Sequence, residues 1–173
     1  DDYAKSNKIN YVALRYFNAA GADPDGEIGE VHLPETHLIP IIFDVALDKR
    51  KNVEIYGTDY ETEDGTCVRD YIHVNDLGNA HISAIDYLLR GEPSICMNVG
   101  TGEGASVKQV ISIAESITRK NISVKFSSRR KGDPPKLVSS SNLIKEKFNL
   151  DGDYLSLEKQ IEDAWKWHLK FFK

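Results

Sequence analysis

The chain of 173 residues is long enough to bury about 70% of the surface that its extended form exposes, so we expect one folded domain. Its 22 Lys and Arg against 27 Asp and Glu give a net charge of -5, which argues against nucleic acid or an anionic membrane as main partner. With 40% hydrophobic and 28% charged residues, the composition is that of a globular protein, not of a disordered chain or a coiled coil. No apolar run approaches the roughly 18 residues that a membrane-spanning helix needs.

The two cysteines and the first residue give expectations about compartment and chain boundaries. Cys67 and Cys96 are too few for a disulfide framework and lie in no Cys-x-x-Cys metal spacing, so we expect a cytoplasmic protein. The chain opens on Asp1 instead of Met, and its first residues show none of the charged-then-apolar pattern of a signal segment. We therefore interpret the sequence as part of a longer protein.

The first half of the chain predicts alternating strands and helices. Residues 11–17 are rich in β-branched and aromatic side chains and predict a mostly buried strand. Apolar residues then recur at helical spacing over 38–46, and the basic run 49–51 is typical of the carboxyl end of a helix. Residues 53–56 alternate as a short strand, which makes this half an α/β pattern.

The middle of the chain repeats this pattern. We predict a strand over 69–74, a helix that Asn75 caps and Gly91 ends, and a further strand over 95–99. The apolar face of this helix is expected to consist of Leu77, Ala80, Ala84, Ile85 and Leu88.

The last third predicts two helices and one strand. Ser106 and Gln109 form a capping box, so a helix should begin there, and residues 122–126 are strand-like. From Ser156 onward, apolar side chains recur every three or four residues, so a last helix must pack one face on the rest of the chain. That face consists of Leu157, Ile161, Ala164, Trp165, His168, Leu169 and Phe172. Overall the chain is predicted to be α/β, with some strands in a small separate layer near the carboxyl end.

Glycines and histidines offer only weak signs of a site. The run Gly100-x-Gly-x-Gly104 resembles part of a phosphate loop but lacks the G-x-G-x-x-G spacing, so a tight turn is the simpler interpretation. His32 and His37 have acidic neighbours, but such pairs are common by chance, and we expect no metal site. We interpret His73 and His81 as packed, partly buried histidines.

The stretch 129–135 is more informative. Arg129, Arg130 and Lys131 can neutralise a phosphate, while Asp133 can accept hydrogen bonds from vicinal hydroxyls, a combination that suits a nucleotide. From composition alone, a solvated basic turn is the favoured interpretation. The sequence shows no Ser-His-Asp order, nucleophile elbow or distinctive carboxylate pair.

Four motifs spread over nearly the whole chain carry a family resemblance. They are YFNAAG at 16–21, PETHLIP at 34–40, TEDGTCVRDYIHVNDL at 62–77 and RRKGDP at 129–134. Together they resemble the carboxyl-terminal half of the UDP-glucose 4-epimerase family, within the extended short-chain dehydrogenases. The run at 62–77 is long and highly specific, and it distinguishes the epimerases from related dehydratases and decarboxylases.

The resemblance implies a Rossmann-type fold in which an amino-terminal domain holds NAD and a smaller α/β domain binds the UDP-sugar. Residues 1–173 would then comprise the last Rossmann strands and the UDP-sugar-binding domain, without the amino-terminal NAD-binding part. The family's cofactor loop, catalytic Ser or Thr and Tyr-x-x-x-Lys would precede Asp1, so we expect no catalytic residues here and no activity from this chain alone. The full-length protein is expected to be a homodimer.

The family interconverts UDP-glucose and UDP-galactose by moving a hydride from sugar C4 to NAD and returning it to the other face of a 4-keto sugar. By resemblance, Tyr16 and Phe17 would lie beside the nicotinamide, and Asn18 would hydrogen-bond the sugar diphosphate. Leu38 would offer its backbone N–H to a phosphate. His37 stands where many members have Asn, and it can still donate to phosphate.

The remaining carried-over roles concern the nucleotide. Tyr56 would pack on the uracil, with backbone contacts from Glu54. Arg69 and Arg130 would bind the diphosphate, and Asp133 would hold the ribose hydroxyls.

Two further positions would shape the sugar pocket. Tyr71 would contribute to its wall. Leu137 stands where, in the family, a bulky tyrosine excludes an N-acetyl group at sugar C2 and a smaller residue admits it.

Two alternatives to the epimerase remain. The first is a non-catalytic module that binds nucleotide-sugars, and the second is a sister nucleotide-sugar dehydratase or decarboxylase. The strand at 11–17 favours an enzyme, because such a strand would normally lie inside a larger sheet. Upstream sequence with the cofactor loop and Tyr-x-x-x-Lys would decide between them.

Overall fold

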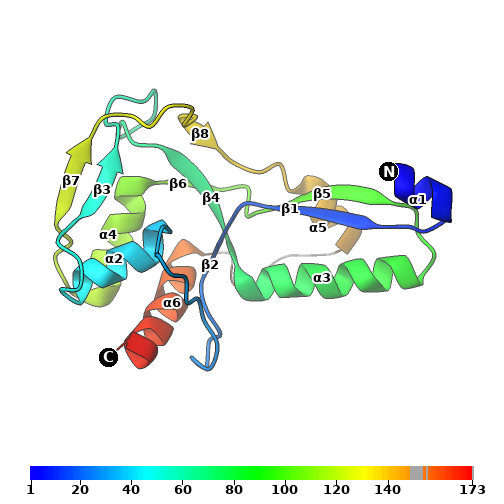
Figure 1. The fold of residues 1–173 in the computed structure, drawn as a ribbon, viewed down its shortest axis with the longest axis horizontal. Helices are drawn as coiled ribbons and strands as arrows, with labels where there is room; N and C mark the ends of the chain where they lie inside the picture. The colour runs from blue at the N-terminus through cyan, green and yellow to red at the C-terminus, as the bar shows by residue number, and fades with distance from the viewer. Residues whose placement is uncertain (149–153, 155, 173) are drawn as a thin grey trace.

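The computed structural model describes residues 1–148, 154 and 156–172, and its elements alternate between helix and strand (Figure 1). In chain order they are α1 (Asp2–Asn7), β1 (Val12–Tyr16), β2 (Asn18–Ala20), α2 (Leu38–Ala46), β3 (Val53–Tyr56), β4 (Val68–His73), α3 (Val74–Leu89), β5 (Ile95–Val99), β6 (Gly104–Ser106), α4 (Val107–Thr118), β7 (Val124–Ser127), β8 (Lys136–Leu137), α5 (Asn142–Phe148) and α6 (Leu157–Phe172).

Parallel pairing dominates the strands. β1 pairs with β5, β2 with β4, and β3 with β7, all in parallel, while β6 joins β4 antiparallel. β8 adds a short parallel pairing to β4, on the same stretch as β6. Because parallel strands need crossover connections, helices lie between most of them. The predicted α/β class is therefore confirmed. β3 and β7 form a sheet of their own, although only β7 comes from the part of the chain where a separate layer was expected.

Two hydrophobic cores occupy opposite ends of the molecule, and β4 runs between them (Figure 1). The smaller core lies among β5, β4, α3 and α5 and includes Met97 and Ala80. The larger one lies among α2, β3, α4 and α6, where Ile42, Val110 and Ile161 are fully buried. Helix α6 thus packs its apolar face as predicted, against α2 and α4.

Several local predictions are confirmed or corrected by the structure. Ser106 and Gln109 form both hydrogen bonds of the capping box at the start of α4. Asn75 does not cap α3, because the His73 imidazole accepts the Asn75 backbone N–H and takes the cap position. Ile85 is 58% exposed and does not belong to the buried face of α3. Helix α2 ends at Ala46, so the basic run lies beyond its last turn.

The predicted burial of the first strand is wrong. β1 is half-buried over its first three residues and exposed over the last two, and Tyr16 is 52% exposed. Within the described residues β5 is the only strand that pairs with it, so its other edge has no ladder. Among the same residues, no helix combines the length and apolar character that crossing a lipid bilayer requires.

Candidate functional site

A cavity of about 1150 Å³ gathers most of the residues singled out by motif. Strands β2, β3 and β4 contribute to its lining, together with helices α2 and α6. Parallel strands bring these segments together, since Asn18 of β2 stands in register with Tyr71 of β4. The predicted site residues in the lining are Phe17, Asn18, His37, Leu38, Glu54, Tyr56, Arg69, Tyr71, Arg130 and Asp133.

Two predicted residues lie outside this lining. Tyr16 is exposed at the end of β1, where its ring faces that of His81 at 5.9 Å. Leu137, in β8, is 48% exposed and pairs in register with Arg69. Leu137 therefore neighbours the site through the backbone of β4, and the cavity wall itself is made by other residues.

The residues predicted to bind the diphosphate and the ribose contact one another. Asp133 accepts from Arg69 at 3.3 Å through Oδ1 and from Arg130 at 2.7 Å through Oδ2. Arg69 is 15% exposed and also donates to the carbonyls of Val68 and Pro134, at 2.8 and 3.0 Å. Arg130 is 61% exposed and able to reorient. One carboxylate thus holds two guanidiniums at the cavity edge, where each has further N–H groups for a ligand.

An aromatic ring lies beside this cluster. The Arg130 guanidinium sits 5.0 Å from the centre of the Tyr56 ring, within cation–π range. The Tyr56 hydroxyl donates to Glu54 at 3.0 Å, and Glu54 also accepts from Lys125 at 3.1 Å and from the Ser127 hydroxyl. These bonds, led by that from Ser127, lower the pKa of Glu54 to about 2. The Tyr56 ring is therefore held in place by an ionised carboxylate.

Helix α2 points its first turn into the cavity. Its first residue, Leu38, lines the cavity, so the positive end of the helix dipole faces that space. The backbone N–H groups of Thr36 and His37 both donate to Glu35 Oε1 at 2.7 Å. The His37 imidazole, expected to face phosphate, lies with Nδ1 at 2.6 Å from Glu30 and 3.1 Å from Glu35.

The glycine run after β5 is not a phosphate loop. Its N–H groups turn inward to the fully buried Asp70, which accepts from Thr101 N at 3.0 Å and Gly102 N at 3.1 Å. Asp70 also accepts from the Thr101 hydroxyl and from Ser139 N. A Cβ on Gly100 would lie 2.6 Å from Asp70 Oδ2, so glycine is required by close approach. The simpler interpretation, a turn, is confirmed only in part, because the turn joins β5 to the short strand β6 and not to a helix, and of its three glycines only Gly102 has a positive φ, of 83°.

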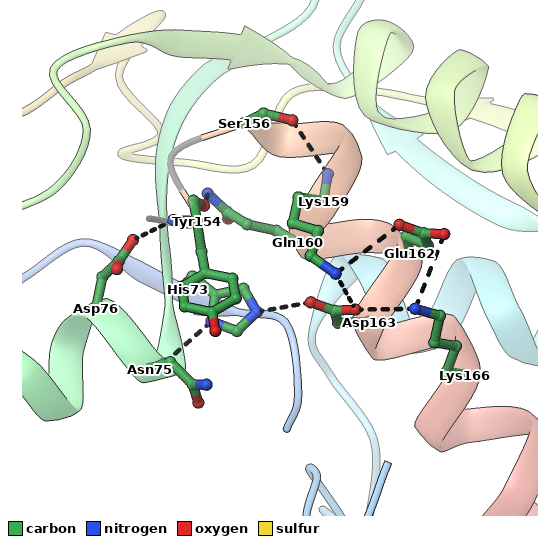
Figure 2. Close-up of polar contacts among 10 residues, drawn as sticks. All are labelled: His73, Asn75, Asp76, Tyr154, Ser156, Lys159, Gln160, Glu162, Asp163 and Lys166. Carbon is green, nitrogen blue, oxygen red and sulfur yellow. Dashed lines mark hydrogen bonds and ion pairs between the residues drawn. The ribbon is translucent and has the colours of Figure 1, made fainter. Parts of the chain in front are cut away.

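His73, at the end of β4, and His81, in α3, differ in their surroundings, and Figure 2 shows those of His73. His73 is fully buried, and its Nε2 lies 3.5 Å from Asp163 of α6 while Tyr154 stacks on its ring at 4.5 Å. Burial lowers the pKa of His73. His81 is exposed, so the expectation that it is packed is wrong. The His73–Asp163 contact ties α6, which forms part of the cavity wall, to the end of β4.

Sequence reasoning missed the contribution of α6 to the cavity. The cavity lining includes Ala164, Trp167 and His168 of this helix. His168 is buried, and its Nε2 lies 3.3 Å from Asp44 Oδ1 of α2. The apolar periodicity of this helix showed that it must pack on the chain, but periodicity does not identify what it packs against.

A family model described as the NAD dependent epimerase/dehydratase family matches residues 1–100. The chain belongs to this family. It is 51% identical to the UDP-glucose 4-epimerase of Halalkalibacterium halodurans over 160 residues, which is 92% of this chain and 48% of that protein. The family resemblance stated from the motifs is thereby confirmed. The chain spans about half the length of the curated relatives it matches.

Solved structures give the same result. A UDP-glucose 4-epimerase from Brucella ovis in complex with NAD is similar with a TM-score of 0.91 and 45% identity, over 95% of this chain and 50% of that one. The Bifidobacterium longum UDP-glucose 4-epimerase in complex with NAD+ and UDP is similar with a TM-score of 0.90 and 32% identity, over 98% of this chain and 51% of that one.

Proposed function

We propose that this chain is the UDP-sugar-binding part of a UDP-glucose 4-epimerase, which interconverts UDP-glucose and UDP-galactose with the help of NAD. The observation that carries the proposal is the pair of guanidiniums, Arg69 and Arg130, that converge on Asp133 at the edge of the cavity. Two guanidiniums can neutralise a pyrophosphate in bidentate geometry, and a carboxylate beside them can accept hydrogen bonds from the ribose hydroxyls.

Ligand binding would exchange partners within this cluster. Arg69 is largely buried, and a buried cation is stable only when an anion compensates it. In the structure Asp133 supplies that anion. The diphosphate would take over the arginines, which leaves the Asp133 oxygens to accept from the ribose hydroxyls.

The base would stack on Tyr56. Its ring is fixed by the hydroxyl bond to Glu54, so little rotational freedom is lost when a base packs on it. Leu38 at the start of α2 would donate its N–H to a phosphate, as helix N-termini commonly do. Asn18, whose amide already donates to the Asp70 carbonyl at 2.7 Å, is positioned between β2 and β4 to contact the sugar diphosphate.

The residues fit an adjoining nicotinamide. Phe17 lines the cavity just beyond the carboxyl end of the parallel strand β1, the edge at which ligands bind in open α/β sheets. Tyr16 beside it presents an exposed ring. When bound, NAD would accept the hydride from sugar C4 and return it to the opposite face. We assign no acid or base to this chain, and we expect a cytoplasmic homodimer for the whole protein.

The experiment is a product analysis with the full-length protein that contains this chain. Incubation with UDP-galactose and NAD should yield UDP-glucose, measured by its NAD-linked oxidation in a coupled assay. UDP binding without conversion would indicate the non-catalytic module, and a dehydrated product would indicate a dehydratase. Release of carbon dioxide from UDP-glucuronate, offered in a parallel incubation, would indicate a decarboxylase. Failure to bind UDP at all would reject the nucleotide-sugar assignment.

A further inference from the structure

Two glutamates and two histidines gather on one short loop before α2. This Glu/His cluster consists of Glu30, His32, Glu35 and His37. His37 Nδ1 lies 2.6 Å from Glu30 and 3.1 Å from Glu35, and His32 Nδ1 lies 3.9 Å from Glu35. The two imidazole rings face each other at 4.9 Å. Three of these side chains, His32, Glu35 and His37, therefore converge on one point, and Glu30 joins them through His37.

Helix α6 holds the loop that carries the cluster. The Trp167 indole donates to the Glu30 carbonyl at 3.1 Å, and its ring covers Gly29, where a Cβ would lie 2.2 Å from it. Further back, Lys170 donates to the Gly26 carbonyl at 2.8 Å. The loop is thus fixed at two places by the same helix. A fixed backbone lowers the ordering cost of assembling ligands from one segment.

The charge and chemistry of the cluster suit a cation. Two carboxylates bring two negative charges, and the imidazoles can offer neutral nitrogen ligands. Mixed nitrogen and oxygen donors are typical of zinc, whereas magnesium takes oxygen ligands almost exclusively. We propose that the Glu/His cluster is a binding site for a zinc-class divalent metal ion.

The separations agree with such a site after small side-chain movements. Donor atoms around a tetrahedral zinc lie about 3.4 Å apart, given metal–ligand bonds of about 2.1 Å. The measured separations of 2.6, 3.1 and 3.9 Å lie on both sides of that value, and the donors of His32, Glu35 and His37 are all within 4.8 Å of one another. His32 and His37 are exposed, so their rings have room to make these small shifts.

Binding would replace a proton by the metal. In the structure His37 Nδ1 faces two carboxylates at hydrogen-bond distance, and the metal would take the place of that hydrogen. Glu35 Oε1 accepts the N–H groups of Thr36 and His37, which fixes its carboxylate in the way that outer-shell hydrogen bonds orient metal ligands. Glu30, Glu35 and His37 also line the cavity. The metal ligands are assigned from distances within the loop and not from nucleotide binding, so the two proposals can fail independently.

The test is titration calorimetry, in which Zn²⁺ alone is added to the purified full-length protein. All variants would carry Cys96→Ser, because Cys96 is an exposed thiol that can itself bind zinc. We expect one zinc per chain, at least about tenfold weaker binding in His32→Asn and in His37→Asn, and no measurable Mg²⁺ binding. The matched control is His81→Asn, an exposed histidine outside the cluster, which should bind as tightly as the parent.

A second measurement keeps the test independent of folding defects. In NMR spectra of the protein with its Glu/His cluster intact, Zn²⁺ should shift the ring resonances of His32 and His37 and leave those of His81 unchanged. Unchanged zinc affinity in both histidine variants, or ring shifts at His81 equal to those at His32 and His37, would overturn the proposal.

Discussion

Arg130 and Asp133 lie three residues apart in the loop between β7 and β8 and pair at 2.7 Å, and the same carboxylate also contacts Arg69 of β4 at 3.3 Å. The two arginines differ in exposure, since Arg69 is 15% exposed and Arg130 is 61% exposed. This difference predicts unequal contributions to UDP binding. Truncation of a largely buried charged residue costs more binding free energy than truncation of an exposed one.

We therefore expect Arg69→Ala in the full-length protein to weaken UDP binding by roughly 2 to 4 kcal/mol, and Arg130→Ala to weaken it by less. Titration calorimetry with UDP measures both. The control is Arg129→Ala, because Arg129 pairs with Asp59 outside the cavity lining and should not affect the dissociation constant. Unchanged affinity in both cavity variants would reject the diphosphate role.

Glu54 predicts a specific dependence of stability on pH. Hydrogen bonds from Ser127, Lys125 and Tyr56 lower its pKa from the ordinary 4.5 to about 2. A lowered carboxyl pKa stabilises the fold above the unfolded value, and that stabilisation is lost as pH falls through the folded value. Glu54→Gln should be less stable than the parent at pH 6, with a difference that shrinks between about pH 4.5 and 2. Urea unfolding of both proteins across this range is the measurement, and a gap independent of pH would contradict it.

The buried imidazole of His73 predicts a second dependence of stability on pH, closer to neutral pH than that of Glu54. Burial lowers its pKa below the ordinary value of 6.5, which outweighs the attraction of Asp163 and Asp76. Because the unfolded chain then binds more protons, stability is complete above about pH 6.5 and falls as the solution is acidified. His73→Gln should be less stable at pH 7.5 but show a smaller loss between pH 7.5 and 5.5. His168→Gln is the comparison, since burial also lowers the pKa of His168. This substitution should likewise reduce the loss of stability between pH 7.5 and 5.5, independently of His73.

Two glycines provide a matched pair for the packing around Asp70. Gly100→Ala would place a Cβ 2.5 Å from Ser139 Oγ and 2.6 Å from Asp70 Oδ2, so overpacking should destabilise the protein by about 1 to 3 kcal/mol. Gly78, inside α3, has nothing within 4 Å of the position that a Cβ would occupy, so Gly78→Ala should stabilise by up to about 1 kcal/mol. Denaturant midpoints test the pair, and equal destabilisation by both would refute the packing argument.

The sequence predicted the parts of the fold that carry strong local signals. Helix α4 follows from its capping box, and α6 follows from its apolar period, because both signals lie within the segment itself. Strands β2, β6 and β8 have three residues or fewer, too short to show alternation, and all three form through pairing with β4. Their existence depends on a distant partner, which no local pattern reveals.

In the candidate site, too, the sequence identifies individual residues but not the contacts between remote segments. Its members were identified by motif, but the motif does not show that Asp133 joins Arg69 and Arg130 before any ligand arrives. Likewise, the glycine run is ambiguous in the sequence, because Asp70, which takes its N–H groups, lies thirty-one positions before Thr101. Contacts between remote segments are set by topology, so they become visible only in the folded chain.

The last prediction concerns the choice of sugar and the position of Leu137. This residue lies in β8 outside the cavity lining and is 48% exposed, but it pairs in register with Arg69, which lines the cavity. We therefore expect a longer side chain at this position to extend toward the bound sugar. Leucine is smaller than tyrosine and has no hydroxyl, and we expect the full-length enzyme to accept UDP-glucose and UDP-galactose well and their N-acetylated counterparts detectably. Because steric exclusion acts on the larger substrate, Leu137→Tyr should lower kcat/KM for the N-acetyl sugars far more than for the plain hexoses. The measurement is the ratio of kcat/KM between the two substrate classes in both proteins, and an identical ratio would show that this position does not select the sugar.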